Sequence, residues 1–128
     1  MFVNKMDLID YDRLESLRRI ANHDMTFLRR YMQAAFEDIE AAINDLQVSI
    51  KAGDVRAGRD ALHKIDGTGS SVGATALLAS AAAMRNYLTT TPDSDTAAAL
   101  AELATVCTLT KSAMAALAPD SHSADRPK

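Results

Sequence analysis

His63 is the residue whose type and neighbours best suit a chemical role in this chain. A neutral imidazole is a nucleophile near pH 7, and one that is exposed on a helix can accept a phosphoryl group. On the same face, at helical spacing, lie two cations, Arg56 and Arg59, and two small residues, Gly67 and Ser70. A glycine one turn from an exposed imidazole removes side-chain bulk, so the active site of another protein can approach. We therefore expect His63 to react with a group that a partner brings.

The stretch around His63 allows two interpretations. Residues 66–71 are rich in Gly, Ser and Asp, which favours a loop. Over a longer window, an apolar stripe with steps of three and four residues favours a helix from about Asp54 to about Val72. The stripe consists of Val55, Gly58, Leu62, Ile65, Gly69 and Val72. We favour the helix, with Asp54 as its N-cap and Gly73 at its end. His63 then lies well away from the core stripe, whereas Gly69 lies in it and lets a neighbouring helix come close.

These residues resemble the signature of the histidine-containing phosphotransfer (HPt) domain family. His63, Gly67, Gly73 and Ala74, at offsets 0, +4, +10 and +11, match that signature, and apolar positions over about residues 8–90 fit it too. In that family the histidine receives a phosphoryl group from the aspartate of one receiver domain and passes it to the aspartate of another. The resemblance implies that His63 is phosphorylated in a multistep two-component system. It also implies receiver domains of a hybrid sensor kinase and of response regulators as partners, with Mg²⁺ bound on the receiver.

One position departs from the family pattern, because Asp66 stands where a lysine is usual. Three residues from His63 on a helix, its carboxylate is expected to repel a phosphoryl group and slow the transfer. The alternative is that Asp66 turns to a nearby arginine or to solvent and has no effect. Arg59, one turn before His63, is the candidate for the missing cation, because a guanidinium pairs with phosphoryl oxygens. Because of Asp66, a second interpretation also remains: a degenerate HPt-like scaffold that binds a receiver or kinase without carrying phosphate. A plain structural bundle is a third interpretation.

The rest of the pattern predicts the helices that position His63. Besides the histidine helix, they are expected over residues 10–20, 25–50, 74–88 and 97–117. We predict an all-α fold, an antiparallel four-helix bundle with a short additional N-terminal helix, over residues 1–118, followed by a disordered polar tail over 119–128. The near-heptad seam of residues 25–50 also fits a coiled-coil dimer. The other apolar faces are sufficient to cover that seam within one chain, so a monomer is expected.

Composition excludes several classes of function. The chain has 128 residues, 48% of them hydrophobic, and a net charge of -3, which suits one domain with a sizeable core. The sequence has no cluster of Lys and Arg, so we expect neither nucleic acid nor an anionic membrane surface as a partner. No uninterrupted run of eighteen apolar residues occurs, so no membrane insertion is expected. The single Cys107 cannot form an internal disulfide, which favours the reducing cytoplasm.

Other chemistry fits the residues less well. The glycines between Gly67 and Gly73 superficially resemble a phosphate-binding loop, but no predicted strand precedes them and no Gly-Lys-Ser/Thr follows. His63 with Asp60 or Asp66 supplies too few ligands for a metal site. The other two histidines, His23 and His122, are assigned no role. We therefore expect a phosphotransfer carrier that is not an enzyme, with no cofactor and no ATP or metal site of its own.

Overall fold

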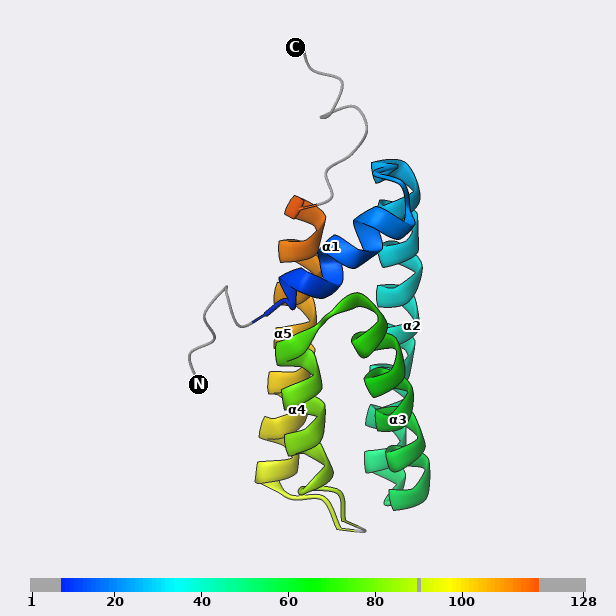
Figure 1. Ribbon diagram of the computed structural model, residues 1–128. Coiled ribbons are helices and arrows are strands. Elements are labelled where there is room, and N and C mark those ends of the chain that lie inside the picture. Colours follow the sequence, from blue (N-terminus) through cyan, green and yellow to red (C-terminus); the bar gives the residue numbers. More distant parts are fainter. Residues whose placement is uncertain (1–7, 90, 118–128) are drawn as a thin grey trace.

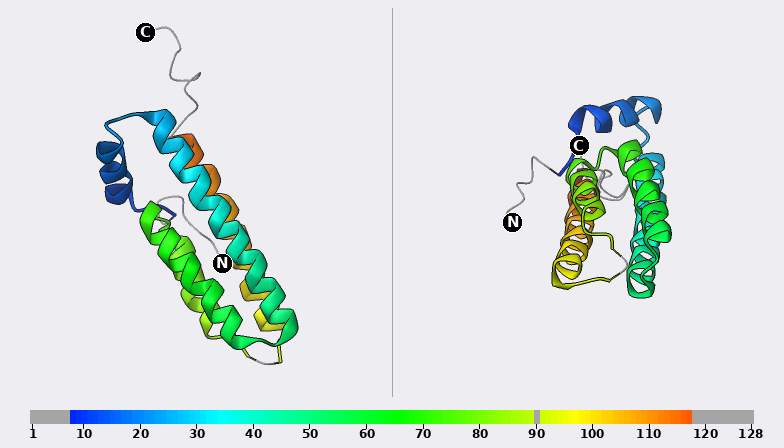
Figure 2. Two further views of the ribbon diagram at one scale, coloured as in Figure 1. Left: turned by 90° about the vertical axis from the view of Figure 1, so that its right-hand side faces the viewer. Right: turned by 90° about the horizontal axis from the view of Figure 1, so that it is seen from below.

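Five helices make up the described part of the chain, residues 8–89 and 91–117, in the computed structural model, and these residues contain no strand. The helices are α1 (Tyr11–Ile20), α2 (Met25–Ala52), α3 (Val55–Val72), α4 (Thr75–Arg85) and α5 (Ser94–Leu117). Helices α2 to α5 run antiparallel as a four-helix bundle, and α1 lies across one end of it (Figure 1). The right-hand view of Figure 2 shows the bundle as two pairs, α2 with α3 and α4 with α5. The predicted fold class is confirmed, while the expected tail over 119–128 and His122 lie outside the described residues.

Aspartates at the helix starts explain where the first three helices begin. Asp10, Asp24 and Asp54 each accept a hydrogen bond on the side chain from the backbone N–H three residues later, at 3.0 to 3.1 Å. Such caps satisfy backbone donors that the first turn of a helix leaves unpaired. At the end of α2, Gly53 adopts a φ of 66°, so the chain reverses at once into α3. Helices α2 and α3 are therefore forced to be antiparallel neighbours.

The loop before α5 differs from the sequence-based expectation. α4 ends at Arg85, three residues before the predicted end, and α5 begins at Ser94, three residues before the predicted start. The early start is explained by Asp93, whose carboxylate accepts hydrogen bonds from the backbone N–H and the hydroxyl of Thr96, at 3.0 and 3.1 Å. These hydrogen bonds lower the pKa of the Asp93 carboxyl. Thr96 is itself buried and donates to the carbonyl of Tyr87, which ties α5 to the end of α4.

One core runs the length of the bundle. Its largest fully buried side chains come from all four long helices: Leu28, Phe36, Ile39, Leu46, Leu62, Ile65, Leu77, Met84, Leu103 and Met114. The apolar seam predicted on α2 is thus covered by other helices of the same chain. Cys107 lies in this core as a free thiol, and burial raises its pKa to about 11.

Helix α5 is long and apolar enough to cross a membrane when only its length and composition are considered, with a mean hydropathy of 1.2. The search for an uninterrupted apolar run did not identify α5, because polar residues interrupt its apolar ones. The mean hydropathy of a window stays high despite such interruptions. The core helices of bundles pass the same test, so length and composition do not distinguish the two kinds of helix. In the bundle, Leu103, Val106 and Met114 of α5 are buried against the other helices.

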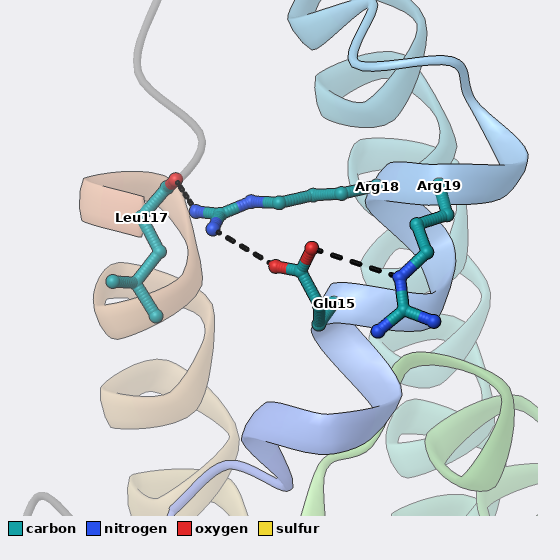
Figure 3. Close-up of polar contacts among 4 residues, drawn as sticks. All are labelled: Glu15, Arg18, Arg19 and Leu117. Atoms are coloured by element: carbon teal, nitrogen blue, oxygen red, sulfur yellow. Dashed lines mark hydrogen bonds and ion pairs between the residues drawn. The ribbon is translucent and has the colours of Figure 1, made fainter.

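Helix α1 is held across the end of the bundle by arginine side chains. Nη2 of Arg18 donates to the carbonyl of Leu117 at 2.9 Å, which joins α1 to the last turn of α5 (Figure 3). The carboxylate of Glu15 forms ion pairs with both neighbouring arginines, from Oε1 to Nη1 of Arg18 at 3.6 Å and from Oε2 to Nε of Arg19 at 3.9 Å (Figure 3). Nε of Arg13 donates to the carbonyl of Ser71 at 3.0 Å, so α1 also holds the C-terminal end of α3.

Gly73 is the point where α1, α3 and α4 meet, and it is expected to tolerate no side chain. Its φ is 73°, and a Cβ built on it would lie 3.0 Å from both the Cβ of Arg13 and the backbone oxygen of Asp10. Gly73→Ala should therefore lower the free energy of unfolding by about 2 kcal/mol, measured by urea denaturation. Gly67→Ala is the matched control, because nothing lies within 4 Å of its added Cβ. If both variants had the same stability, this account of Gly73 would be wrong.

Candidate functional site

His63 is exposed near the middle of α3, which is a continuous helix from Val55 to Val72. The helical interpretation of residues 54–72 is confirmed, and the loop interpretation of residues 66–71 is wrong. The reason is the stripe of buried residues, in which Leu62 and Ile65 are fully covered. Burying this stripe outweighs the local preference of Gly and Ser for loops. The imidazole is therefore presented to solvent from a helix that the core holds in place.

Gly67 and Gly69 of α3 lie in two different environments, as their positions predict. Gly69 is buried, and a Cβ built on it would lie 3.2 Å from Cδ2 of Leu78, so its missing side chain lets α4 come close. Gly67 is exposed, one turn after His63, and a Cβ built on it meets nothing within 4 Å. Folding therefore does not require glycine at position 67, and the open surface beside His63 is available to a partner.

The remaining predicted site residues lie on the same side of α3 as His63. Arg56, Arg59 and Ser70 are exposed, and Asp66 is partly buried. At about 100° per residue, Arg59, Asp66 and Ser70 lie within about 60° of His63 around the helix axis. The face around the imidazole thus combines cations, a carboxylate and small side chains.

A surface groove of about 600 Å³ lies between α2 and α3 and includes His63. The residues that line it are His63, Lys64, Gly67, Thr68 and Ser71 from α3, and Asp38, Ala41, Ala42 and Asp45 from α2. The sequence analysis missed Lys64 and the two α2 carboxylates. Lys64 follows His63 directly and so points about 100° away on an isolated helix. Only the pairing of α2 with α3, which the sequence pattern does not reveal, makes it part of the same groove.

The α2 side of this groove continues into an exposed row of side chains. Phe27, Tyr31, Asp38, Asp45 and Val48 are all exposed and lie at helical spacing on one face of α2. Phe27 and Val48 leave more than half of their surface in solvent. Along this row Phe27 and Tyr31 stand near the start of α2 and Val48 near its end, with the two carboxylates between them.

Asp66 forms an ion pair with Arg85, near the end of α4, through Oδ2 and Nη2. Both side chains are about one third exposed. The ion pair agrees with the second of the two expectations for Asp66, in which its carboxylate turns to a nearby arginine. Its effect on phosphoryl transfer stays a prediction. The sequence analysis did not identify Arg85, because it is distant along the chain and only the register of α3 against α4 brings it to Asp66.

Among residues 8–89 and 91–117, no group of three or more His, Cys, Asp or Glu side chains is arranged to hold a metal ion.

Comparison with known families fits this geometry. The Hpt domain model matches residues 27–118, which is most of the chain and includes α3 with His63. The chain therefore belongs to the Hpt domain family, whose members carry phosphoryl groups on histidine in phosphorelays. Searches among curated proteins and among solved structures each give no match.

Proposed function

We propose that this protein is a phosphorelay intermediate that accepts a phosphoryl group on His63 from the aspartate of one receiver domain and passes it to another. The observation that carries the proposal is the setting of His63. Its spacing to Gly67, Gly73 and Ala74 resembles the HPt signature, it is exposed near the middle of α3, and open surface adjoins it at Gly67. The partners are receiver domains of a hybrid sensor kinase and of response regulators.

The transfer needs little from this chain besides a well-placed nucleophile. A ring nitrogen of His63 attacks the phosphorus of the aspartyl phosphate, the new N–P bond forms, and the bond from phosphorus to the aspartate oxygen breaks. The receiver's carboxylate leaves as an anion, and transfer to the second receiver reverses these steps. Phosphoryl transfer depends mainly on positioning and on cations that offset charge. The receiver supplies Mg²⁺, and this chain supplies the oriented imidazole and the positive charges around it, without a cofactor of its own.

Docking is proposed to use the groove between α2 and α3 together with the exposed row on α2. Gly67 gives the partner space to approach, and Phe27, Tyr31 and Val48 supply apolar contacts. Arg56, Arg59 and Lys64 attract the negatively charged aspartyl phosphate. We propose that the protein works in this way as a monomer in the cytoplasm.

A two-step transfer experiment tests the proposal. A receiver domain phosphorylated at its aspartate is mixed with this protein and Mg²⁺, and a second receiver domain is added after the first has been removed. Phosphate is expected on this protein after the first step and on the second receiver after the second. If this protein bound both receivers but never acquired phosphate, it would be a scaffold and the proposal would be wrong.

A further inference from the structure

We propose that Arg85 of α4, oriented by Asp66, is the cation that pairs with the phosphoryl group on His63. This inference rests on the proposed function and names a residue that the sequence pattern did not reveal. Phosphorylation places a dianionic group at an exposed position of α3, and a guanidinium is the side chain that best matches its oxygens. Asp66 takes the place of a cation on α3 itself, so a cation from another helix is the natural substitute.

The register of the two helices places Arg85 beside His63. α4 runs antiparallel to α3, and two glycine contacts show how they align, one with α4 and one with Leu88 just beyond its end. A Cβ built on Gly69 would lie 3.2 Å from Leu78, and one built on Gly58 would lie 3.2 Å from Leu88. Interpolation between these contacts puts the backbone of Arg85 level with the turn of α3 that holds His63.

From this level the side chain of Arg85 extends to Asp66, about one turn further along α3. Its Nη2 reaches Oδ2 of Asp66, which lies three residues after His63 on the side of α3 that faces α4. Side chains three residues apart on a helix are neighbours, with Cβ atoms about 5 to 6 Å apart. The guanidinium therefore lies within reach of a phosphoryl group on the imidazole, and Lys64 stands on the opposite side, in the α2–α3 groove.

Asp66 acts here as a positioning residue. Its carboxylate engages one edge of the guanidinium, and the other N–H donors of Arg85 stay free to bind phosphoryl oxygens. The pair is about one third exposed, so a phosphoryl group can reach these donors without unpacking the bundle. A positioning role and a repulsive role of Asp66 have opposite effects on the rate of phosphoryl transfer. Removing the Asp66 carboxylate should slow the transfer, because Arg85 loses its orientation.

The test uses protein phosphorylated chemically with phosphoramidate, so it does not depend on a receiver. Phosphorus NMR gives the second pKa of the phosphoryl group on His63, which a nearby cation lowers. Arg85→Gln should raise this pKa by about half a unit or more, and Arg85→Lys should restore part of the shift. Arg59→Ala is the comparison, since Arg59 is the competing cation on α3. If Arg59→Ala raised the pKa and Arg85→Gln left it unchanged, the inference would be wrong.

A second measurement follows transfer from a phosphorylated receiver. Arg85→Gln and Asp66→Asn should each slow the formation of phosphohistidine by about threefold to tenfold, a range typical of losing one hydrogen bond of ordinary strength at a partly exposed site. Urea denaturation checks that the variants remain folded. Faster transfer by Asp66→Asn would show that Asp66 repels the phosphoryl group and would overturn its positioning role. If even the unaltered protein took no phosphate from a receiver, the proposed function would fail, while the NMR result would still decide the role of Arg85.

Discussion

Gly67→Leu is expected to lower phosphoryl transfer from a receiver domain by about tenfold or more, while phosphorylation by phosphoramidate stays nearly unchanged. The leucine side chain would stand in open surface one turn from His63, where nothing except the chain neighbours and the backbone of α3 itself lies within 4 Å of the Cβ position. It would not disturb the fold, but it would hold the aspartyl phosphate of the receiver away from the imidazole. A small phosphodonor is not affected by such an obstacle. The ratio of the two rates therefore separates docking from reactivity.

Two further variants make this experiment specific. Gly67→Ala should preserve transfer and raise the free energy of unfolding by up to about 1 kcal/mol, because alanine is the better helix former. Gln47→Leu adds the same leucine to an exposed position of α2 away from the groove, and it should leave transfer unchanged. Transfer at the normal rate by Gly67→Leu would show that the receiver does not approach over Gly67.

The helix of His63 could be predicted from the sequence because its determinants are local. The buried stripe from Val55 to Val72 follows the helical period, and the caps at Asp54 and Gly73 stand next to it in the chain. The exposure of His63 follows from the same stripe. The start of α5 was predicted three residues late, because Asp93, Ser94 and Asp95 are all suitable caps and composition does not determine which of them begins the helix.

The charged surroundings of His63 could not be predicted, because they depend on the register between helices. Arg85 meets Asp66 through the alignment of α4 against α3, in which Gly69 lies against Leu78 of α4 and Gly58 lies against Leu88, just beyond the end of α4. Likewise, Asp38 and Asp45 share a groove with His63 only through the packing of α2 on α3. Periodicity identifies which face of a helix is buried, but it does not determine how far one helix slides along another.

His63→Gln is expected to abolish phosphorylation of this protein. Glutamine has no nucleophilic nitrogen of the imidazole type, and no other group on the exposed face of α3 can replace it at the same position. The substitution is mild for the fold, since the side chain is exposed and glutamine is a good helix former. Urea denaturation should therefore give nearly the same stability, which assigns the loss to chemistry rather than to unfolding.

The most direct test of the central claim is the phosphate bound to this protein after incubation with a phosphorylated receiver domain and Mg²⁺. The control is His23→Asn, which removes another exposed histidine at a position with a φ of 60° that asparagine tolerates. Acid-labile, base-stable phosphate should appear on the unaltered protein and on His23→Asn, and it should be absent from His63→Gln. Equal phosphate on His63→Gln, or none on the unaltered protein, would contradict the claim that His63 carries the phosphoryl group.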